Sequence, residues 1–336
     1  MNIEIKMLNV KDGDAIIVFL YKEGQTLLML IDAGHVGDAT RVKKELDIFL
    51  KKLNKKAPDV IVCTHYDNDH IGGLKEIISF YGKDIGVVWM HKTSSIIELV
   101  NEYTHQKDTV SILPSEDDFY LTDGININDQ DFQIVLENLK QEVALIRQLE
   151  LLSITIKEPI AGHCSIDDWA EIQVIGPTMV YYKRLFPDHF DREKFLKEEV
   201  EALSSELISA EHSLGDPYLF LDNLPKSLVT NPNLNSAIIL ITVKNHKYLF
   251  TGDAGIESFY EIPHYQEVLR NIYWLKVPHH ASKNNLNSEI IKLLSPVYAF
   301  ISGNKHISQA VLDCFRACGS KIKTTKESND DLEFYE

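Results

Sequence analysis

The first thirty residues alternate between hydrophobic and polar positions in the manner of β-strands. Ile3, Ile5 and Met7 are separated by polar residues, and two β-rich runs follow at 15–21 and 27–31. A short polar stretch containing a glycine separates these runs. Because side chains of a strand alternate between its two faces, this pattern predicts an opening strand followed by a β-hairpin.

Helical spacing begins after the tripeptide Asp32-Ala33-Gly34. The pattern predicts an amphipathic helix over about 40–53, a strand over 59–64 and a second helix from near Ile71. Strands return in the second half of the chain, where turn residues separate the apolar runs. The expected strands are 171–175, 237–243, 248–251 and 273–277.

The middle of the chain is helical and acidic. Apolar residues keep helical spacing over about 132–151, and a second stretch over about 192–211 has apolar residues on one face and glutamates on the other. We interpret both as core-facing helices with solvated outer faces, with binding of a protein partner as the alternative. We expect a single domain over 1–336, with helical insertions at about 98–160 and 178–230.

Two similar units divide the chain. The segment LMLIDAG begins at Leu28 and YLFTGDAG begins at Tyr248, so two expected strands end in the same Asp-Ala-Gly. Roughly 30 positions after each aspartate, another expected strand ends in histidine, in DVIVCTHYDNDH and in YWLKVPHHASKNN. This is an internal duplication of a strand, acid, helix, strand and histidine unit. Two such units facing each other would bring acids and imidazoles to one rim.

Composition predicts the cellular compartment of the protein and limits the kinds of molecule that it binds. The 336 residues are 44% hydrophobic, which is enough to bury a large core. No run reaches the roughly 20 apolar residues needed to cross a bilayer, and the start lacks a signal-peptide core, so we expect a cytoplasmic protein that does not enter the membrane. The net charge of −16 disfavours tight, nonspecific duplex DNA binding, although bound divalent ions reverse the sign locally.

The four cysteines are few and scattered, which excludes a dense disulfide scaffold. Cys314 and Cys318 are spaced to share one helix face, which leaves a metal pair as an alternative. No second pair or histidine knuckle accompanies them, so we interpret them as small buried hydrophobic residues.

The segment from Thr64 to Gly73 concentrates chemistry. It places two histidines and two aspartates within six residues, directly after a buried strand. His65 and Asp67 point to the same side of an extended chain, while Asp69 and His70 lie in the first turn of the next helix. Such crowding is costly unless cations neutralise it. The alternative is that these residues only cap a helix and line a polar loop. A cap needs only one Asp or Asn, so this alternative leaves the other acidic and histidine residues unexplained.

Two later segments offer further ligands. Asp253 stands at a strand end beside small residues, which suits a carboxylate that bridges two ions; a simple turn aspartate is the alternative. His279 and His280 follow another strand. Since adjacent side chains diverge on an extended segment, we expect one ligand, His279, while His280 contacts substrate or protonates a leaving group.

Taken together, these segments resemble the metallo-β-lactamase superfamily and, within it, the soluble relatives of the hydrolase domain of the competence protein ComEC. The resemblance covers nearly the whole chain, although 92–230 matches only loosely. It implies an α/β fold, a four-layer αββα sandwich, with a dinuclear site at one edge of the sheets. It also implies hydrolysis by a metal-bridged hydroxide. The matching stretches are MLNVKDGDAIIV, LIDAG, THYDNDHIGG, LFTGDAG, and LKVPHHASKNN followed by ISGNKH.

The resemblance also implies roles for individual residues. Asp32 would orient the site, and Asp253 would bridge two divalent ions. Asp67 replaces the histidine that is common at its position, and this harder ligand shifts the expected metal from zinc toward manganese. The first ion would be held by His65 and Asp67, and the second by Asp69, His70 and His279.

The chain departs from the family pattern at one ligand. No histidine directly follows the expected strand 171–175, so His163 or Asn235 would complete the first ion's ligands, or that ion would be held weakly. The catalytic residues would include the metal ligand Asp69. Three further residues would steady the phosphate or assist the leaving oxygen, namely His280, His306 and Lys283. The alternative for each of these three is a plain surface role.

The expected activity is metal-dependent hydrolysis, with phosphodiesters as the first choice of substrate. The enzyme would be a nuclease or nucleotide phosphodiesterase that uses two zinc or manganese ions. A lactone or thioester hydrolase is the second hypothesis, because one fold serves many chemistries. The third is an effector subunit regulated by a protein partner through the acidic helices.

Overall fold

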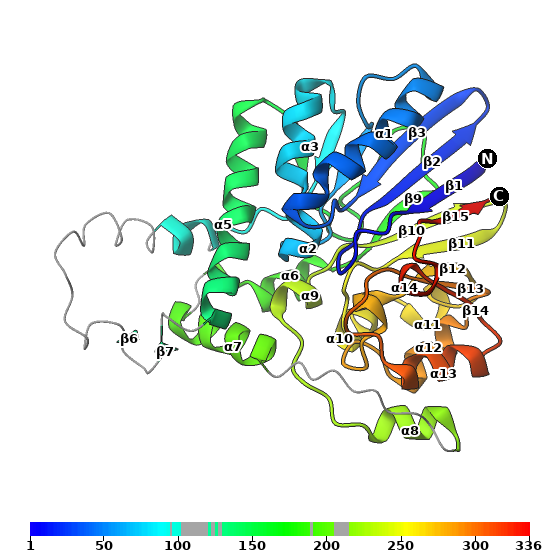
Figure 1. Cartoon of the computed structure of the whole chain (residues 1–336). Coiled ribbons are helices and arrows are strands. Elements are labelled where there is room, and N and C mark those ends of the chain that lie inside the picture. Colours follow the sequence, from blue (N-terminus) through cyan, green and yellow to red (C-terminus); the bar gives the residue numbers. More distant parts are fainter. Residues whose placement is uncertain (95, 102–119, 122–124, 127–129, 189–190, 205–214) are drawn as a thin grey trace.

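Two β-sheets face each other, and helices cover their outer sides (Figure 1). The computed structural model describes residues 1–94, 96–101, 120–121, 125–126, 130–188, 191–204 and 215–336. The chain termini lie close together at one end of the sheets, where the last strand pairs with the first. The expected α/β architecture of four layers, αββα, is confirmed.

The first sheet has the strand order β15-β1-β2-β3-β4-β5-β8. The predicted hairpin is present, because β2 and β3 pair antiparallel. The next three pairs, β3 with β4, β4 with β5 and β5 with β8, are parallel. The strands are β1 (Asn2–Met7), β2 (Ile16–Lys22), β3 (Gln25–Ile31), β4 (Val60–Val62), β5 (Val87–Trp89), β8 (Ile156–Lys157) and β15 (Leu332–Tyr335).

The second sheet has the order β14-β13-β12-β11-β10-β9. Strands β11 and β12 are a parallel pair like β3 and β4, so the two units of the internal duplication are built alike. The strands are β9 (Ile172–Gly176), β10 (Ile238–Val243), β11 (His246–Phe250), β12 (Ile272–Lys276), β13 (Tyr298–Ile301) and β14 (Lys321–Thr324); β6 (Tyr120–Leu121) and β7 (Ile125–Asn126) form a separate small sheet.

Three apolar cores hold the four layers together. The central core lies between the sheets and contains the inward side of β1, with Ile3, Ile5 and Met7, as well as Trp89 and Trp274. A second core packs helices onto the outer face of the first sheet, and a third does so on the second sheet. Because side chains alternate along each strand, each sheet has apolar residues on its inner face for the central core and on its outer face for a helix-covered core.

The outer helices match the expected periodicity. The predicted helix over 40–53 is α1 (Ala39–Leu53), whose buried residues face the first sheet. The segment expected to begin a helix near Ile71 forms α2 (Asn68–Ile71) and then α3 (Leu74–Tyr81). The second sheet is covered by α10 (Ile256–Tyr260), α11 (Tyr265–Val268), α12 (Ser288–Leu294) and α13 (Gln309–Ala317), and α14 (Thr325–Ser328) precedes β15.

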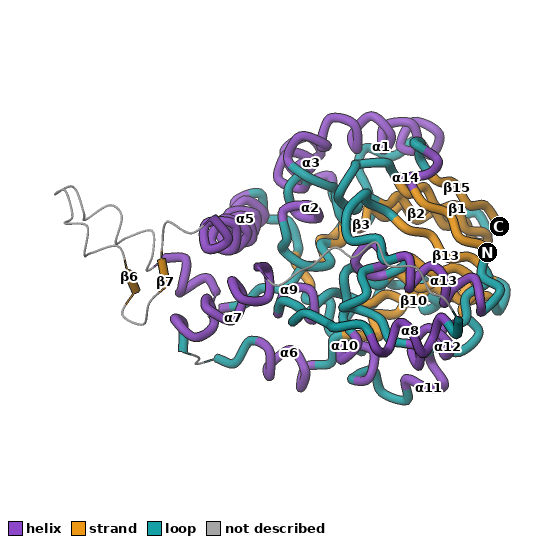
Figure 2. Tube along the Cα trace, turned by 60° about the horizontal axis from the view of Figure 1, so that its bottom comes forward, coloured by secondary structure: helices purple, strands orange, loops and turns teal. Residues whose placement is uncertain are grey.

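The insertions contain the predicted helices. The helix expected over 132–151 is α5 (Gln130–Leu151), which lies beside α2 and α3 (Figures 1 and 2). The second expected helix is present as α7 (Arg192–Ser204), which packs on α5, while its predicted end at 205–211 lies outside the described residues. The other helices here are α6 (Met179–Leu185), α8 (Pro217–Asn223) and α9 (Asn231–Leu234).

Two further features bear on the sequence predictions. Within the described ranges, no helix combines the length and apolarity needed to cross a membrane. Cys314 is buried on α13 and its thiol donates to the Pro217 carbonyl, while the Cys318 sulfur lies 3.0 Å from the Tyr218 hydroxyl. These contacts use both sulfurs in packing α8 onto α13.

Candidate metal centre

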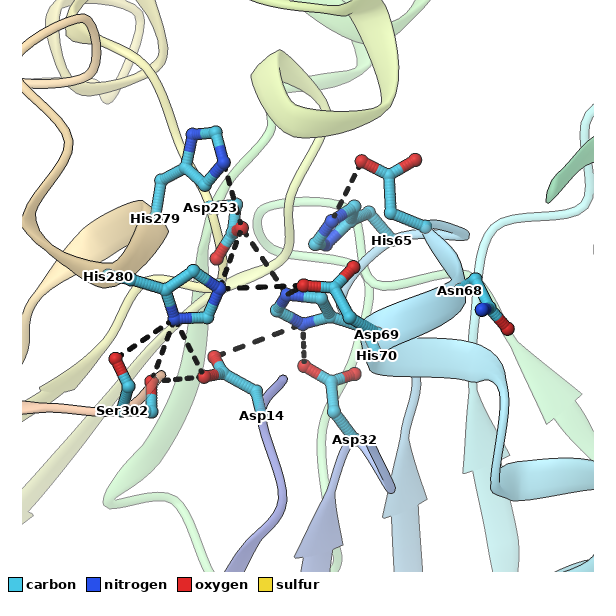
Figure 3. Close-up of polar contacts among 12 residues, drawn as sticks. Asp14, Asp32, His65, Asn68, Asp69, His70, Asp253, His279, His280 and Ser302 are labelled. Atoms are coloured by element: carbon cyan, nitrogen blue, oxygen red, sulfur yellow. Dashed lines mark hydrogen bonds and ion pairs between the residues drawn. The ribbon is translucent and has the colours of Figure 1, made fainter. Parts of the chain in front are cut away.

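The loops that follow four parallel strands meet at one edge of the two sheets (Figure 3). Asp32 follows β3 and His65 follows β4 in the first unit, while Asp253 follows β11 and the histidine pair follows β12 in the second. The duplication therefore brings acids and imidazoles from both halves of the chain together, as the sequence predicts.

The helix α2 aims the central ligands. Asp67 has extended backbone and caps α2, so Asp69 and His70 lie in its first turn, as predicted. His70 is fully buried, and its Nε2 lies 3.3 Å from Asp253 Oδ2 and 3.7 Å from Asp69 Oδ2. A short helix thus turns two consecutive side chains toward the aspartate of the opposite unit.

Asp32 determines the proton positions on two histidines. Its Oδ2 accepts hydrogen bonds from His70 Nδ1 at 2.8 Å and from the Thr64 hydroxyl at 2.6 Å. Because the Thr64 proton is used in this way, the Thr64 oxygen accepts from His65 Nδ1 at 3.0 Å. Both imidazoles therefore carry their proton on Nδ1, and both keep an Nε2 lone pair for a metal ion.

The histidine pair does not follow the expected extended geometry. The prediction of an extended segment here is wrong, because His279 and His280 have left-handed backbone, with φ of 43° and 50°, in a tight turn over Pro278–Ala281. His279 Nδ1 donates to Asn285 Oδ1 at 2.9 Å, and His280 Nδ1 donates to the Ser302 carbonyl at 3.0 Å. Both Nε2 atoms consequently face Asp253 Oδ2, at 3.8 Å and 4.0 Å.

The close approach of His280 to the neighbouring chain requires a glycine. Gly303 has φ of 82°, and a Cβ atom there would lie 2.5 Å from His280 Nδ1. A side chain at this position would displace the imidazole as well as strain the backbone. Gly303 belongs to the ISGNKH stretch, so this part of the resemblance has a direct steric reason.

The nitrogen and oxygen atoms at the centre match the requirements of divalent cations. Among the described residues, His65, His70 and His280 have buried Nε2 atoms without a hydrogen-bond partner. Ligand atoms of His65, His70 and Asp253 all lie within 4.8 Å of one another. Buried lone pairs beside carboxylates are costly unless a cation satisfies them. The residues therefore fit the divalent metal ions that the sequence predicts.

His280 lies close to two residues that are expected to bind the second ion, Asp69 and His70. His280 Nε2 lies 3.5 Å from Asp69 Oδ2, and His280 is fully buried. His279 reaches Asp253 Oδ2, and its ring packs 5.0 Å from the ring of His306. The turn thus places His280 toward Asp69 and His70, and His279 toward His306.

A buried ion pair supports the centre and was missed by sequence reasoning. Asp14, only 1% exposed, pairs with Lys276, and it accepts from the Ser302 hydroxyl. The Lys276 ammonium also donates to Asp253 Oδ1 at 3.0 Å, which leaves Oδ2 facing the histidines. A signal was present, because Gly13-Asp14-Ala15 repeats the tripeptide that contains Asp253.

The ion pair explains how the buried acids stay ionised. Burial acts to raise the pKa of Asp253, but in the metal-free centre the protonated His70, together with Lys276 and His279, holds that pKa well below its usual value. Burial acts to lower the pKa of His70, but the neighbouring carboxylates raise it in return, and a bound cation would take the place of the proton on its Nε2. Burial likewise acts to raise the pKa of Asp14, and Lys276 is the main group that lowers it. Ligand atoms of Asp14, His70 and His280 also cluster within 4.8 Å, but Lys276 already supplies the positive charge at this carboxylate.

The remaining candidates for the first ion differ in position. Asp67 Oδ2 lies 3.6 Å from His65 Nε2, as expected for two ligands of one ion. Asn235 is buried beside His65, and the next residue, Ser236, contacts both His65 Nδ1 and the Asp253 backbone amide. His163 is exposed on the loop before β9, and no contact recorded among the described residues joins it to the centre.

Among the predicted substrate-binding residues, His306 lies beside the ring of His279. His306 is partly buried, and burial together with the two neighbouring histidines lowers its pKa to about 4. Lys283 is buried in the loop after the histidine pair, and its carbonyl accepts from Lys226 Nζ at 2.7 Å. His306 therefore borders the centre, while the backbone at Lys283 is anchored to the rest of the fold.

Comparisons with known proteins gave a family match and distant similarity to solved structures. Residues 12–143 match the sequence profile of the Metallo-beta-lactamase superfamily. A solved structure titled "Crystal Structure of a New Diphosphatase from the PhnP Family" is similar to this chain with 12% identity and a TM-score of 0.38, covering 100% of this chain and 98% of that one. None of the curated proteins matches. The profile match over part of the chain and the two-sheet architecture are consistent with the metallo-β-lactamase fold, whose members typically bind divalent metals.

Proposed function

We propose that the chain is a metal-dependent phosphodiesterase that hydrolyses nucleotides or single-stranded nucleic acid. One observation carries this proposal. Four imidazoles hold their Nδ1 protons in fixed hydrogen bonds and direct their Nε2 atoms toward Asp67, Asp69 and Asp253. Such a cluster of lone pairs and carboxylates suits two divalent ions.

The bound ions would lower the pKa of water to supply a nucleophile near neutral pH and would neutralise an anionic substrate oxygen. His65 and Asp67 would hold the first ion, and Asp253 would contribute to both. In place of the expected His279, we assign His280 to the second ion together with Asp69 and His70, because of its distance to Asp69.

The other residues then act on the substrate. His279 keeps its Nδ1 proton in the bond to Asn285, so Nε2 would give a proton to the leaving oxygen only from the imidazolium form, in which both ring nitrogens are protonated. His306 packs against His279 and limits its movement, and Lys283 contributes positive charge to the same loop. An oxygen-rich first site with Asp67 favours manganese over zinc.

The acidic surface favours a small substrate over a long duplex. A net charge of −16 repels extended polyanions, whereas it has little effect on the binding of a compact neutral molecule. A lactone or thioester is therefore the second candidate substrate class. Binding of a protein partner to the acidic outer faces of α5 and α7 stays a prediction.

The activity is tested with bis(p-nitrophenyl) phosphate, a single-stranded oligonucleotide and a lactone panel, each with added manganese or zinc. We expect phosphodiester cleavage that chelation abolishes. His65→Ala should remove turnover, whereas His163→Ala should retain it, because His163 lies apart from the centre. Faster turnover of lactones than of every phosphodiester would select the second candidate, and full activity of His65→Ala would exclude both.

The assignment of the histidine pair has its own test. His280→Ala should lose one of two bound manganese ions, since its Nε2 lies beside Asp69. His279→Ala should keep both ions but lower kcat and flatten the limb of the pH profile that reports the leaving-group proton. Metal content by mass spectrometry separates the two outcomes, and loss of an ion from His279→Ala alone would restore the ligand set predicted from sequence.

A further inference from the structure

The helix α5 contacts the ligand loop directly. Asn138 Nδ2 donates to Asp67 Oδ1 at 3.1 Å, and Gln141 Nε2 donates to Asn68 Oδ1 at 3.1 Å. These two residues are one turn apart on α5, so one face of the helix is hydrogen-bonded to the loop. An ionised carboxylate only accepts, so the Asn138 amide must present its NH₂ group to Asp67.

The contact determines which oxygen of Asp67 is free for the first ion. Oδ1 is engaged by Asn138, and Oδ2 lies 3.6 Å from His65 Nε2. Asp253 is held similarly, because Lys276 donates to its Oδ1 and leaves its Oδ2 free to bind a metal ion. Each carboxylate is thus held by one oxygen and offers the other.

The same helix borders a small cavity behind His65. The cavity measures about 10 Å³; Cys63, Met90 and Pro232 form part of its lining, and the polar groups of His65, Tyr66, His91, Glu142 and Asn235 also border it. Glu142 comes from α5, one helical turn after Asn138, and is only 1% exposed. The insertion therefore supplies a buried acid beside a predicted metal ligand.

The polar atoms around this cavity lack partners of good geometry. Among the residues described, these include both carboxyl oxygens of Glu142, His91 Nδ1, Asn235 Oδ1 and the Tyr66 hydroxyl. His91 Nε2 donates to the Asn235 carbonyl at 3.0 Å, so its Nδ1 is an acceptor. Burial lowers the pKa of His91 to about 3 and raises that of Glu142 to about 8, although the Thr93 amide opposes the latter rise.

One water molecule would satisfy these groups. A buried water needs about 10–15 Å³ and two to four polar partners, and this cavity offers both. Water donates two hydrogen bonds, which suits a cavity where acceptors predominate. A helix that only covered the core would carry apolar residues at these positions, because an unpartnered buried carboxyl group is costly.

We propose that α5 positions the first half of the metal centre, with Asn138 orienting Asp67 and with Glu142, His91 and Asn235 holding a water behind His65. This rests on the two-ion centre of the proposed function. Asn138 and Glu142 are positioning residues, since they act through Asp67 and His65. An insertion helix thereby compensates for the family histidine that this chain lacks.

The test is titration of metal-free full-length protein with manganese, followed by calorimetry. Asn138→Leu removes the donor to Asp67 and should weaken binding at one site by about 10- to 100-fold, with the other site unchanged. The matched control is Gln148→Leu on the same helix, where Nε2 donates to Lys75 O and Ser79 Oγ of α3 instead. This control should bind both ions as the unaltered protein does.

The cavity is tested with two variants of Glu142. Glu142→Gln keeps polar atoms around the water and should retain near-normal manganese affinity, whereas Glu142→Leu fills the cavity and should weaken the same site as Asn138→Leu. Thermal unfolding of each metal-free variant monitors the fold. An altered Tm with unchanged affinity would indicate a purely structural role and overturn the inference.

The possible failures are distinguishable. Two bound ions without phosphodiester cleavage would reject the proposed function, and the inference about α5 would still be judged by the titrations. Normal affinity of both Asn138→Leu and Glu142→Leu in an active enzyme would reject the inference alone. Absence of any bound ion in the unaltered protein would reject both.

Discussion

Asp253→Asn is expected to reduce phosphodiester turnover by about 10³-fold, which corresponds to the several kcal/mol that metal ions contribute to transition-state stabilisation. Ligand atoms of Asp253, His65 and His70 lie within 4.8 Å of one another, so Asp253 would serve both ions. The amide keeps the size of the side chain but removes the charge, and when its NH₂ group takes that position it repels a cation.

The measurements are kcat with manganese and the number of ions bound per chain. Asp253→Asn should bind at most one ion, while Asp167→Asn, at an exposed surface acid, should behave as the unaltered protein does. Retention of two ions and of at least a tenth of the turnover by Asp253→Asn would show that Asp253 does not bridge the centre.

Lys276→Met should lower the free energy of unfolding of the metal-free protein by about 3–5 kcal/mol, the usual cost of removing one partner of a buried ion pair. Lys276 is 1% exposed and lies between the carboxylates of Asp14 and Asp253. Without the ammonium group, two buried negative charges lose their nearest compensation. Urea unfolding measures the change.

A second substitution separates charge from packing. In Asp14→Asn combined with Lys276→Met, one uncompensated charge is removed, so part of the lost stability should return. Lys183→Met is the control, because its pair with Asp188 is exposed and should be worth at most about 1 kcal/mol. Additive losses in the double variant would mean that the pair is not coupled, and that packing of the Lys276 stem accounts for the effect.

Much of the architecture was predictable from local pattern. Period-two alternation located β1, β2 and β3, helical spacing located α1 and α5, and the repeated Asp-Ala-Gly revealed the duplication. These signals are short-range, because the burial of each face of a strand or helix is already encoded in its own residues. The gathering of His65, Asp69, His70 and Asp253 followed from motif order.

The geometry of the centre required tertiary structure. The left-handed turn at His279 and His280 depends on Asn285 and on the Ser302 carbonyl, which lie elsewhere in the chain. Local pattern indicated an extended segment there, and so it could not decide which imidazole approaches Asp69.

The sequence alone determined the individual strands and helices and the set of acids and imidazoles, because periodicity and motif spacing are local properties, and the resemblance carried by the motifs implied the layered α/β fold. Only the folded chain decided how these groups are held. Asp14 pairs with Lys276 across 262 positions, and Asn138 reaches Asp67 across 71. Such contacts exist because buried charges and donors must be paired with groups that lie near them in space. The separation of two residues along the sequence does not show which groups will be paired.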